Sequence, residues 1–187
     1  MKKIVFLIIL FFPFIVLAST KDTVTLSKCV DGDTARFILN KEEIKVRFIG
    51  IDTPESVKPN TEVEPYGKEA SNYTCKKLKN AKKIVLEYEE KKDKIDRYGR
   101  YLAYVFVDDK LLEELIVKNG YANLKYINSN YKYYDELIKA EEIAKKNKKN
   151  IYSDDEYVNN ELKDDIEKIV KKYTKKILSN ILKEIFN

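Results

Sequence analysis

Residues 23–51 read TVTLSKCV-DGD-TARFILN-KE-EIKVRFIGI, and this stretch decides the fold. The turn signals Asp31-Gly32 and Asn40-Lys41 divide it. Between them lie three short segments rich in β-branched and aromatic residues: 23–30, 34–40 and 43–51. Short segments of this composition with turns between them are typical of consecutive antiparallel strands. The stretch therefore predicts a three-stranded meander.

The third segment also predicts the direction of an arginine. Apolar and basic residues alternate in IKVRF, residues 44–48. Successive side chains of a strand point to opposite faces of the sheet. Arg47 is therefore expected on the face opposite Ile44, Val46 and Phe48.

Three helices and two more strands are predicted further along the chain. The helical patterns cover 67–79, 111–119 and 131–148, and the strand-like alternation covers 82–89 and 100–107. Residues 56–65 read as a polar loop. Five strands that begin as a meander, with three helices between and after them, indicate an α+β domain that is mainly a small β-barrel.

The last part of the chain differs from this domain. Apolar residues recur at spacings of three or four between Leu162 and Ile185, and lysines fill the other side. This pattern predicts an extra amphipathic C-terminal helix at 161–187, within a linker-and-helix region of residues 154–187. Two interpretations stay open: packing on the barrel or self-association, and weak adhesion to an anionic surface.

The first residues have the pattern of a secretory signal peptide. Two lysines precede the uncharged run 4–17, and Ala18-Ser19 follows it. We expect cleavage after Ala18 and a secreted protein with one domain at 19–153. A membrane anchor formed by 4–17 is the alternative, although spanning a bilayer takes about 20 apolar residues.

Composition limits the chemistry. The chain contains no histidine, which excludes imidazole catalysis and histidine-ligated zinc. Its net charge of +5 is only weak evidence for a nucleic-acid partner. Two cysteines in an exported chain suggest a disulfide between Cys29 and Cys75, and two separate buried thiols are the alternative.

Five charged residues suggest a metal-assisted phosphodiesterase. Asp33 and Asp52 carry the hard oxygen ligands that Ca²⁺ prefers, and Glu55 is a candidate base for activating water. Arg47 and Arg100 can each bind a phosphate with two hydrogen bonds. Taken singly, the same residues fit an ordinary hairpin turn, a loop carboxylate and surface ion pairs.

Several dispersed motifs occur in one order between residues 23 and 153. They are VDGDT (30–34), VRFIGIDTPE (46–55), EPYGKEA (64–70), NAKKI (80–84), DRYGRYLAY (96–104) and IYS (151–153). In these motifs the chain resembles the staphylococcal nuclease (thermonuclease) family. The resemblance implies a five-stranded OB-fold barrel with three helices. Its best-known member lacks cysteines at 29 and 75, so the resemblance gives no support to the bridge.

The resemblance also implies an activity, namely Ca²⁺-dependent hydrolysis of DNA and RNA at the 5′ P–O bond that leaves 3′-phosphate ends. Asp33, Asp52 and the backbone carbonyl of Thr53 would bind the metal, and Pro54 favours an extended backbone at Thr53. Glu55 would act as or position the general base. The two arginines would stabilise the charge that develops on the phosphate.

The family also implies contacts with the polymer. Tyr98 would contact a terminal phosphate and Tyr126 would stack on a base. Arg97 stands where the best-known member has lysine, and Asn128 stands where it has a second tyrosine. A catalytically silent OB-fold module that binds nucleic acid is the alternative function, and the presence of all five charged residues favours the nuclease.

Overall fold

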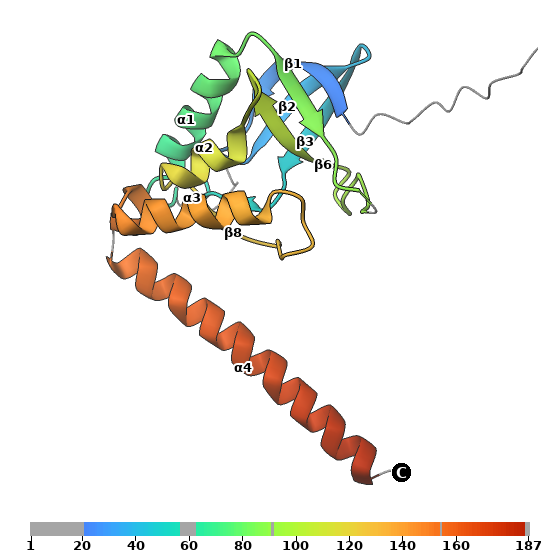
Figure 1. Ribbon diagram of the computed structural model, residues 1–187, viewed down its shortest axis with the longest axis vertical. Helices are drawn as coiled ribbons and strands as arrows, with labels where there is room; N and C mark the ends of the chain where they lie inside the picture. Colours follow the sequence, from blue (N-terminus) through green and yellow to red (C-terminus); the bar gives the residue numbers. More distant parts are fainter. Residues whose placement is uncertain (1–20, 57–62, 91, 154, 186–187) are drawn as a thin grey trace, which may run out of the picture.

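The computed structural model describes residues 21–56, 63–90, 92–153 and 155–185 (Figure 1). The predicted signal peptide, the alternative anchor at 4–17 and most of the polar loop at 56–65 lie outside the described residues. Among the described helices, none is both long enough and apolar enough to cross a membrane.

Five strands close into a mixed barrel, which confirms the predicted OB-type architecture. They are β1 (Lys21–Cys29), β2 (Thr34–Leu39), β3 (Glu42–Phe48), β5 (Ile84–Glu87) and β6 (Tyr101–Val107). β1 pairs antiparallel with both β2 and β5, and β5 pairs with β6. A parallel pairing of β3 with β6 closes the barrel.

Three short strands lie outside the five of the barrel among the described residues. β7 (Lys110–Leu111) pairs with the end of β6, while β4 (Ile51–Asp52) pairs antiparallel with β8 (Asn123–Leu124). The sequence pattern ran on to residue 51, but the strand ends at Phe48. Gly50 has a φ of +80°, which turns the chain so that Asp52 belongs to a separate ladder.

The three predicted helices are confirmed. They are α1 (Gly67–Asn80), α2 (Leu112–Lys118) and α3 (Tyr134–Lys146), followed by the 3₁₀ turn η1 (Asn150–Ser153). Helix α4 (Asp155–Ile185) starts directly beyond η1, within the region where a linker was expected before residue 161. It runs away from the barrel as one long helix (Figure 1).

The alternation in β3 determines what the barrel buries. Ile44, Val46 and Phe48 are all buried in the main core, whereas Arg47 lies on the other face, as predicted. Apolar residues of the other strands and of α2 complete this core, among them Phe37, Leu86, Val105, Leu112 and Ile116. The inward-facing side chains of the strands thus form the core, and the polar side chains lie on the outward face.

A buried carboxylate joins three distant parts of the chain. Glu87 at the end of β5 is 1% exposed and pairs with Lys21 Nζ at 3.0 Å and with Lys132 Nζ. The hydroxyl of Tyr133 donates a further hydrogen bond of 2.9 Å to it. Burial raises the pKa of Glu87, but the hydrogen bonds from Lys132, Lys21 and Tyr133 outweigh it and hold the pKa below its usual range.

We expect Glu87→Gln to lower the free energy of unfolding at neutral pH by about 2 kcal/mol, because it removes charge-assisted hydrogen bonds from a buried site. A depressed pKa stabilises the fold at pH values above the unfolded-state pKa of about 4.3, and this contribution is lost as the pH falls through the lower pKa of the folded state. Urea unfolding of both proteins across the acid range measures the difference. A difference that does not shrink with acidification would contradict the role of the charge.

Candidate active site

Seven of the predicted site residues line one hollow of about 640 Å³. Their positions along the chain explain why they meet. Asp33 ends the turn between β1 and β2, Arg47 lies in β3 directly opposite Thr34, and Arg100 immediately precedes β6. The hollow is lined by Asp33, Arg47, Asp52, Thr53, Glu55, Arg100 and Tyr126 among others.

Arg47 bridges the two aspartates. Its Nη1 lies 3.0 Å from Asp33 Oδ2, and its Nη2 lies 2.7 Å from Asp52 Oδ1. Lys125 Nζ lies 2.6 Å from the second oxygen of Asp52. Two carboxylates therefore lie within reach of one guanidinium, and a lysine that the sequence analysis did not single out adds a second positive charge.

Asp33 is held from several directions. The Thr34 hydroxyl donates to its Oδ1 at 2.9 Å, and the amide and hydroxyl of Thr53 donate to its Oδ2 at 3.0 and 3.2 Å. Burial raises the pKa of Asp33 and outweighs the opposing effects of Arg47 and of these hydrogen bonds. A positive charge close to this carboxyl would favour its ionised form.

The donor atoms fit a hard cation. Carboxylate and carbonyl oxygens are the ligands that Ca²⁺ prefers, and Asp33 and Asp52 offer carboxylate oxygens that contact the same guanidinium. Within the part of the chain that the structure describes, no three acidic, histidine or cysteine side chains lie close enough together to hold a metal ion. A cation bound here would therefore need backbone carbonyl, water or substrate oxygens to complete its coordination.

Arg100 is oriented by an aspartate that the sequence analysis missed. Asp96 Oδ2 accepts hydrogen bonds from Arg100 Nε at 2.7 Å and lies 2.7 Å from its Nη2. Asp96 Oδ1 accepts the backbone amides of Tyr98 and Arg100 at 2.9 Å each. Burial raises the pKa of Asp96, but these hydrogen bonds lower it below its usual value. The turn at Gly99 could have indicated this role of Asp96 from the sequence. An aspartate at the start of a turn commonly accepts a hydrogen bond from the backbone amide two residues further along the chain.

A second hollow of about 420 Å³ adjoins the first, and Arg47, Arg100 and Tyr126 line both. Tyr98 and Tyr126 are 67% and 81% exposed. The guanidinium carbon of Arg97 lies 4.8 Å from the centre of the Tyr98 ring. Exposed rings beside cationic groups suit the binding of planar, negatively charged ligands.

The backbone around Glu55 packs closely against α1. The Glu55 amide donates to the carboxylate of Glu64 at 2.9 Å, and the Glu64 amide donates to the Glu55 carbonyl at 3.0 Å. A Cβ added to Gly67 would come within 2.5 Å of that carbonyl oxygen. Glycine at the start of α1 thus allows the helix to approach the segment that carries Glu55.

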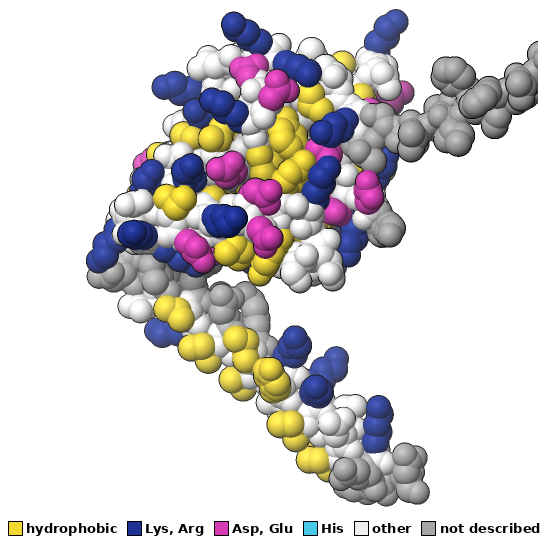
Figure 2. All heavy atoms as spheres, in the orientation of Figure 1, with side chains coloured by type: hydrophobic (Ala, Val, Ile, Leu, Met, Phe, Trp, Pro, Cys, Tyr) yellow, Lys and Arg dark blue, Asp and Glu magenta, His cyan; other side chains and the backbone are white. Residues whose placement is uncertain are grey.

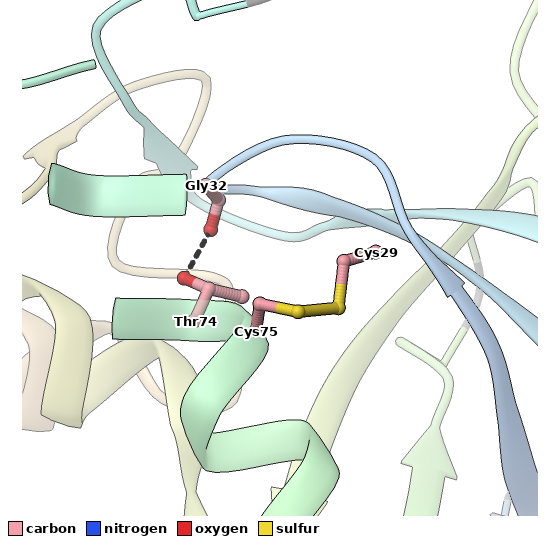
Figure 3. Close-up of a disulfide and its surroundings, with 4 residues drawn as sticks. All are labelled: Cys29, Gly32, Thr74 and Cys75. Carbon is pink, nitrogen blue, oxygen red and sulfur yellow. Dashed lines mark hydrogen bonds between the residues drawn. A yellow bond between two sulfur atoms is a disulfide. The ribbon is translucent and has the colours of Figure 1, made fainter. Parts of the chain in front are cut away.

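The loop before Asp33 is tied to α1 by two neighbouring residues (Figure 3). Cys29 and Cys75 form a disulfide, as predicted from the residues alone. The Thr74 hydroxyl donates to the Gly32 carbonyl at 2.7 Å and is fully buried. Both ends of the short turn that precedes Asp33 are therefore attached to one rigid helix.

Known proteins are similar to this chain over most of its length. A family model described as staphylococcal nuclease homologue matches residues 45–154. The chain is 44% identical over 135 residues to a thermonuclease of Staphylococcus hyicus, covering 72% of this chain and 78% of that protein. It is also 44% identical over 138 residues to the endonuclease YncB of Bacillus subtilis, covering 73% of this chain and 64% of that protein. For the SPbeta prophage-derived endonuclease YokF of the same species, the identity is 46% and the coverage 72% and 45%.

Loss of the bridge should destabilise the protein. The two cysteines are 46 residues apart, and in the chain-entropy account a loop of this length contributes about 4 kcal/mol. We expect the double variant Cys29→Ser, Cys75→Ser to lose a large part of that free energy of unfolding, measured by urea denaturation. The wild type unfolded under reducing conditions should match the variant. An unchanged unfolding midpoint in both experiments would show that the bridge does not constrain the unfolded chain.

Proposed function

Because this chain belongs to the staphylococcal nuclease family, we propose that it is a Ca²⁺-dependent nuclease that hydrolyses the phosphodiester bonds of DNA and RNA. The hydrolytic nuclease reaction is supported by the thermonuclease and endonucleases to which it is similar. The observation that carries the proposal is the single hollow in which Asp33, Asp52, Glu55, Arg47 and Arg100 meet.

The oxygen atoms for the metal would come from Asp33, Asp52 and the backbone carbonyl of Thr53. Bound there, Ca²⁺ would serve as a Lewis acid and as a template for the phosphate. Asp33 is oriented by hydrogen bonds from Thr34 and Thr53, but it also pairs with Arg47. Both aspartates would therefore exchange at least part of their pairing with Arg47 for the metal, and Asp52 also part of its pairing with Lys125.

The arginines would act on the reacting phosphate. Arg47 would exchange part of its pairing with the two aspartates for phosphate oxygens, and Arg100 would donate from the N–H groups that Asp96 does not engage. Both would stabilise the charge that develops during attack. Asp96 holds Arg100 through its Nε and Nη2, which leaves Nη1 directed elsewhere and reduces the number of orientations available to the side chain. Asp96 is thus a positioning residue.

Glu55 would accept or orient the proton of the attacking water. The water oxygen would bond to phosphorus as the bond from phosphorus to the 5′ oxygen breaks. The 5′ oxygen would take up a proton from solvent and leave as a hydroxyl, and the phosphate would stay on the 3′ oxygen. Tyr98 and Arg97 would contact a neighbouring phosphate, and the exposed ring of Tyr126 would stack on a base, which contributes about 1 to 3 kcal/mol in other single-strand binders.

We also propose that the protein is secreted after cleavage behind Ala18. The disulfide supports this location, because such bridges persist in oxidising compartments outside the cytosol. The mature protein would begin at Ser19. Sequencing of the exported protein checks the cleavage site, and an intact Met1 on exported material would contradict it.

Removal of the cation should abolish the activity. We expect plasmid DNA and RNA to be degraded with Ca²⁺ and to persist when EGTA is added, because two carboxylates cannot share a site with phosphate unless a cation offsets their charge. Restoring free Ca²⁺ in excess is the control. Undiminished cleavage in EGTA would contradict the metal dependence, and binding of the polymers without cleavage in Ca²⁺ would favour the silent binding module.

Replacement of Arg100 by lysine should impair catalysis and leave folding intact. Arg100→Lys keeps the positive charge but loses the planar fork, so we expect kcat to fall about a hundredfold or more. Arg36→Lys is the matched control, since Arg36 lies on the same barrel and pairs with Glu43 at the surface. The thermal midpoints of both variants should stay close to that of the wild type. A near-normal kcat for Arg100→Lys would refute the assigned role.

A further inference from the structure

Helix α4 exposes a continuous apolar stripe. Nine large apolar residues between Leu162 and Leu182 are each 46–58% exposed. Figure 2 shows hydrophobic side chains along one edge of the helix and lysines along the other. A stripe of this size is rarely left uncovered on a soluble protein.

The charges of α4 are divided between its two halves. Residues 155–167 contain six acidic residues and one lysine, a net charge of −5. Residues 168–185 contain six lysines and one glutamate, a net charge of +5. The helix is therefore a strong charge dipole, with the apolar stripe running through both halves.

We propose that α4 pairs with α4 of a second copy of this chain, in antiparallel orientation. An antiparallel pair places the acidic half of each copy beside the basic half of the other, so both ends attract. A parallel pair would place halves of like charge side by side, which is destabilising. The two apolar stripes would cover one another.

The residue spacing supplies a register for this pair. The two helices would cross level at the point between residues 169 and 170, near the middle of α4. Leu162 of one copy then lies opposite Ile177 of the other, and Ile166 lies opposite Tyr173. The same register sets Glu167 opposite Lys172. These apolar residues of the stripe thus lie level with apolar residues, in one arrangement without gaps or insertions. Lys163 lies level with Lys176 and Lys168 with Lys171, so the attraction acts between the oppositely charged halves as wholes and not within every facing pair.

A second copy fits this helix better than a lipid surface does. An anionic membrane would attract residues 168–185 but repel residues 155–167, so half of the helix would be held away from it. A stable protein interface buries about 800 Å² on each partner. Nine half-exposed side chains of this size offer apolar area of that order.

The first experiment is sedimentation equilibrium of the whole mature protein. We expect a monomer–dimer equilibrium, and we expect Ile177→Asp to raise the dissociation constant at least about tenfold by burying a charge in the stripe. Ser179→Asp is the matched control, because it adds the same charge two residues away and off the stripe. Its dissociation constant should change much less. Equal effects of both variants would overturn the interface.

The second experiment tests orientation. An equimolar mixture of Leu162→Cys and Ile177→Cys proteins should form a disulfide-linked heterodimer on mild oxidation, and neither variant alone should cross-link through the new cysteine. In the antiparallel register two copies of residue 177 lie 15 residues apart along the axis, about 22 Å. Cross-linking of each variant with itself would show a parallel pair and overturn the proposal.

A third measurement tests whether the apolar stripe binds a lipid surface instead of a second copy of the chain. The protein is mixed with vesicles that contain phosphatidylglycerol and with neutral phosphatidylcholine vesicles. A monomer at all concentrations that is retained on the anionic vesicles would assign the stripe to a lipid surface instead. A monomer that binds neither would also overturn the pairing.

Discussion

Two neighbouring carboxylates at the edge of a barrel repel one another, and Arg47 offsets that repulsion by contacting both Asp33 and Asp52. The barrel is built so that this contact forms. Arg47 lies on the outer face of β3 because its neighbours fill the core, and the parallel pairing with β6 brings Arg100 to the same hollow. The geometry of the candidate active site therefore depends on the closure of the barrel and on the side-chain alternation of one strand.

The sequence predicts those parts of the fold whose signal is local. The alternation in residues 44–48 has a period of two, which allows hardly any structure except a strand with Arg47 facing outward. The end of β3 before Gly50 could not be predicted from the sequence, because Ile49 and Ile51 continue the apolar run on both sides of the glycine. The start of α4 was hidden for another reason: acidic residues before Leu162 resemble a linker, although negative charge near a helix N-terminus is stabilising.

The sequence motifs contain the acidic and basic residues that we propose to act on the substrate, but they do not reveal the residues that hold these side chains in place. Lys125 contacts Asp52 across 73 residues of sequence, and Thr74 contacts Gly32 across 42. Contacts at such separations produce no recognisable sequence pattern, because only the folding of the chain into the barrel brings the two residues of each pair together. Buried Glu87 was equally hidden, since an alternating strand does not reveal that lysines from two distant segments will reach its end.

The disulfide joins two parts of the chain that both come before the closing strand of the barrel. Cys29 and Cys75 both precede the closing strand β6, which begins at Tyr101. The bridge can therefore join β1 to α1 while the barrel is still an open sheet that lacks its last strand. Non-local strand pairings form slowly and leave edges exposed in the meantime. A bridge formed at this stage would hold the Asp33 turn against α1 through this interval, so one end of the candidate site would acquire its shape before the pairing of β6 brings Arg100 to it.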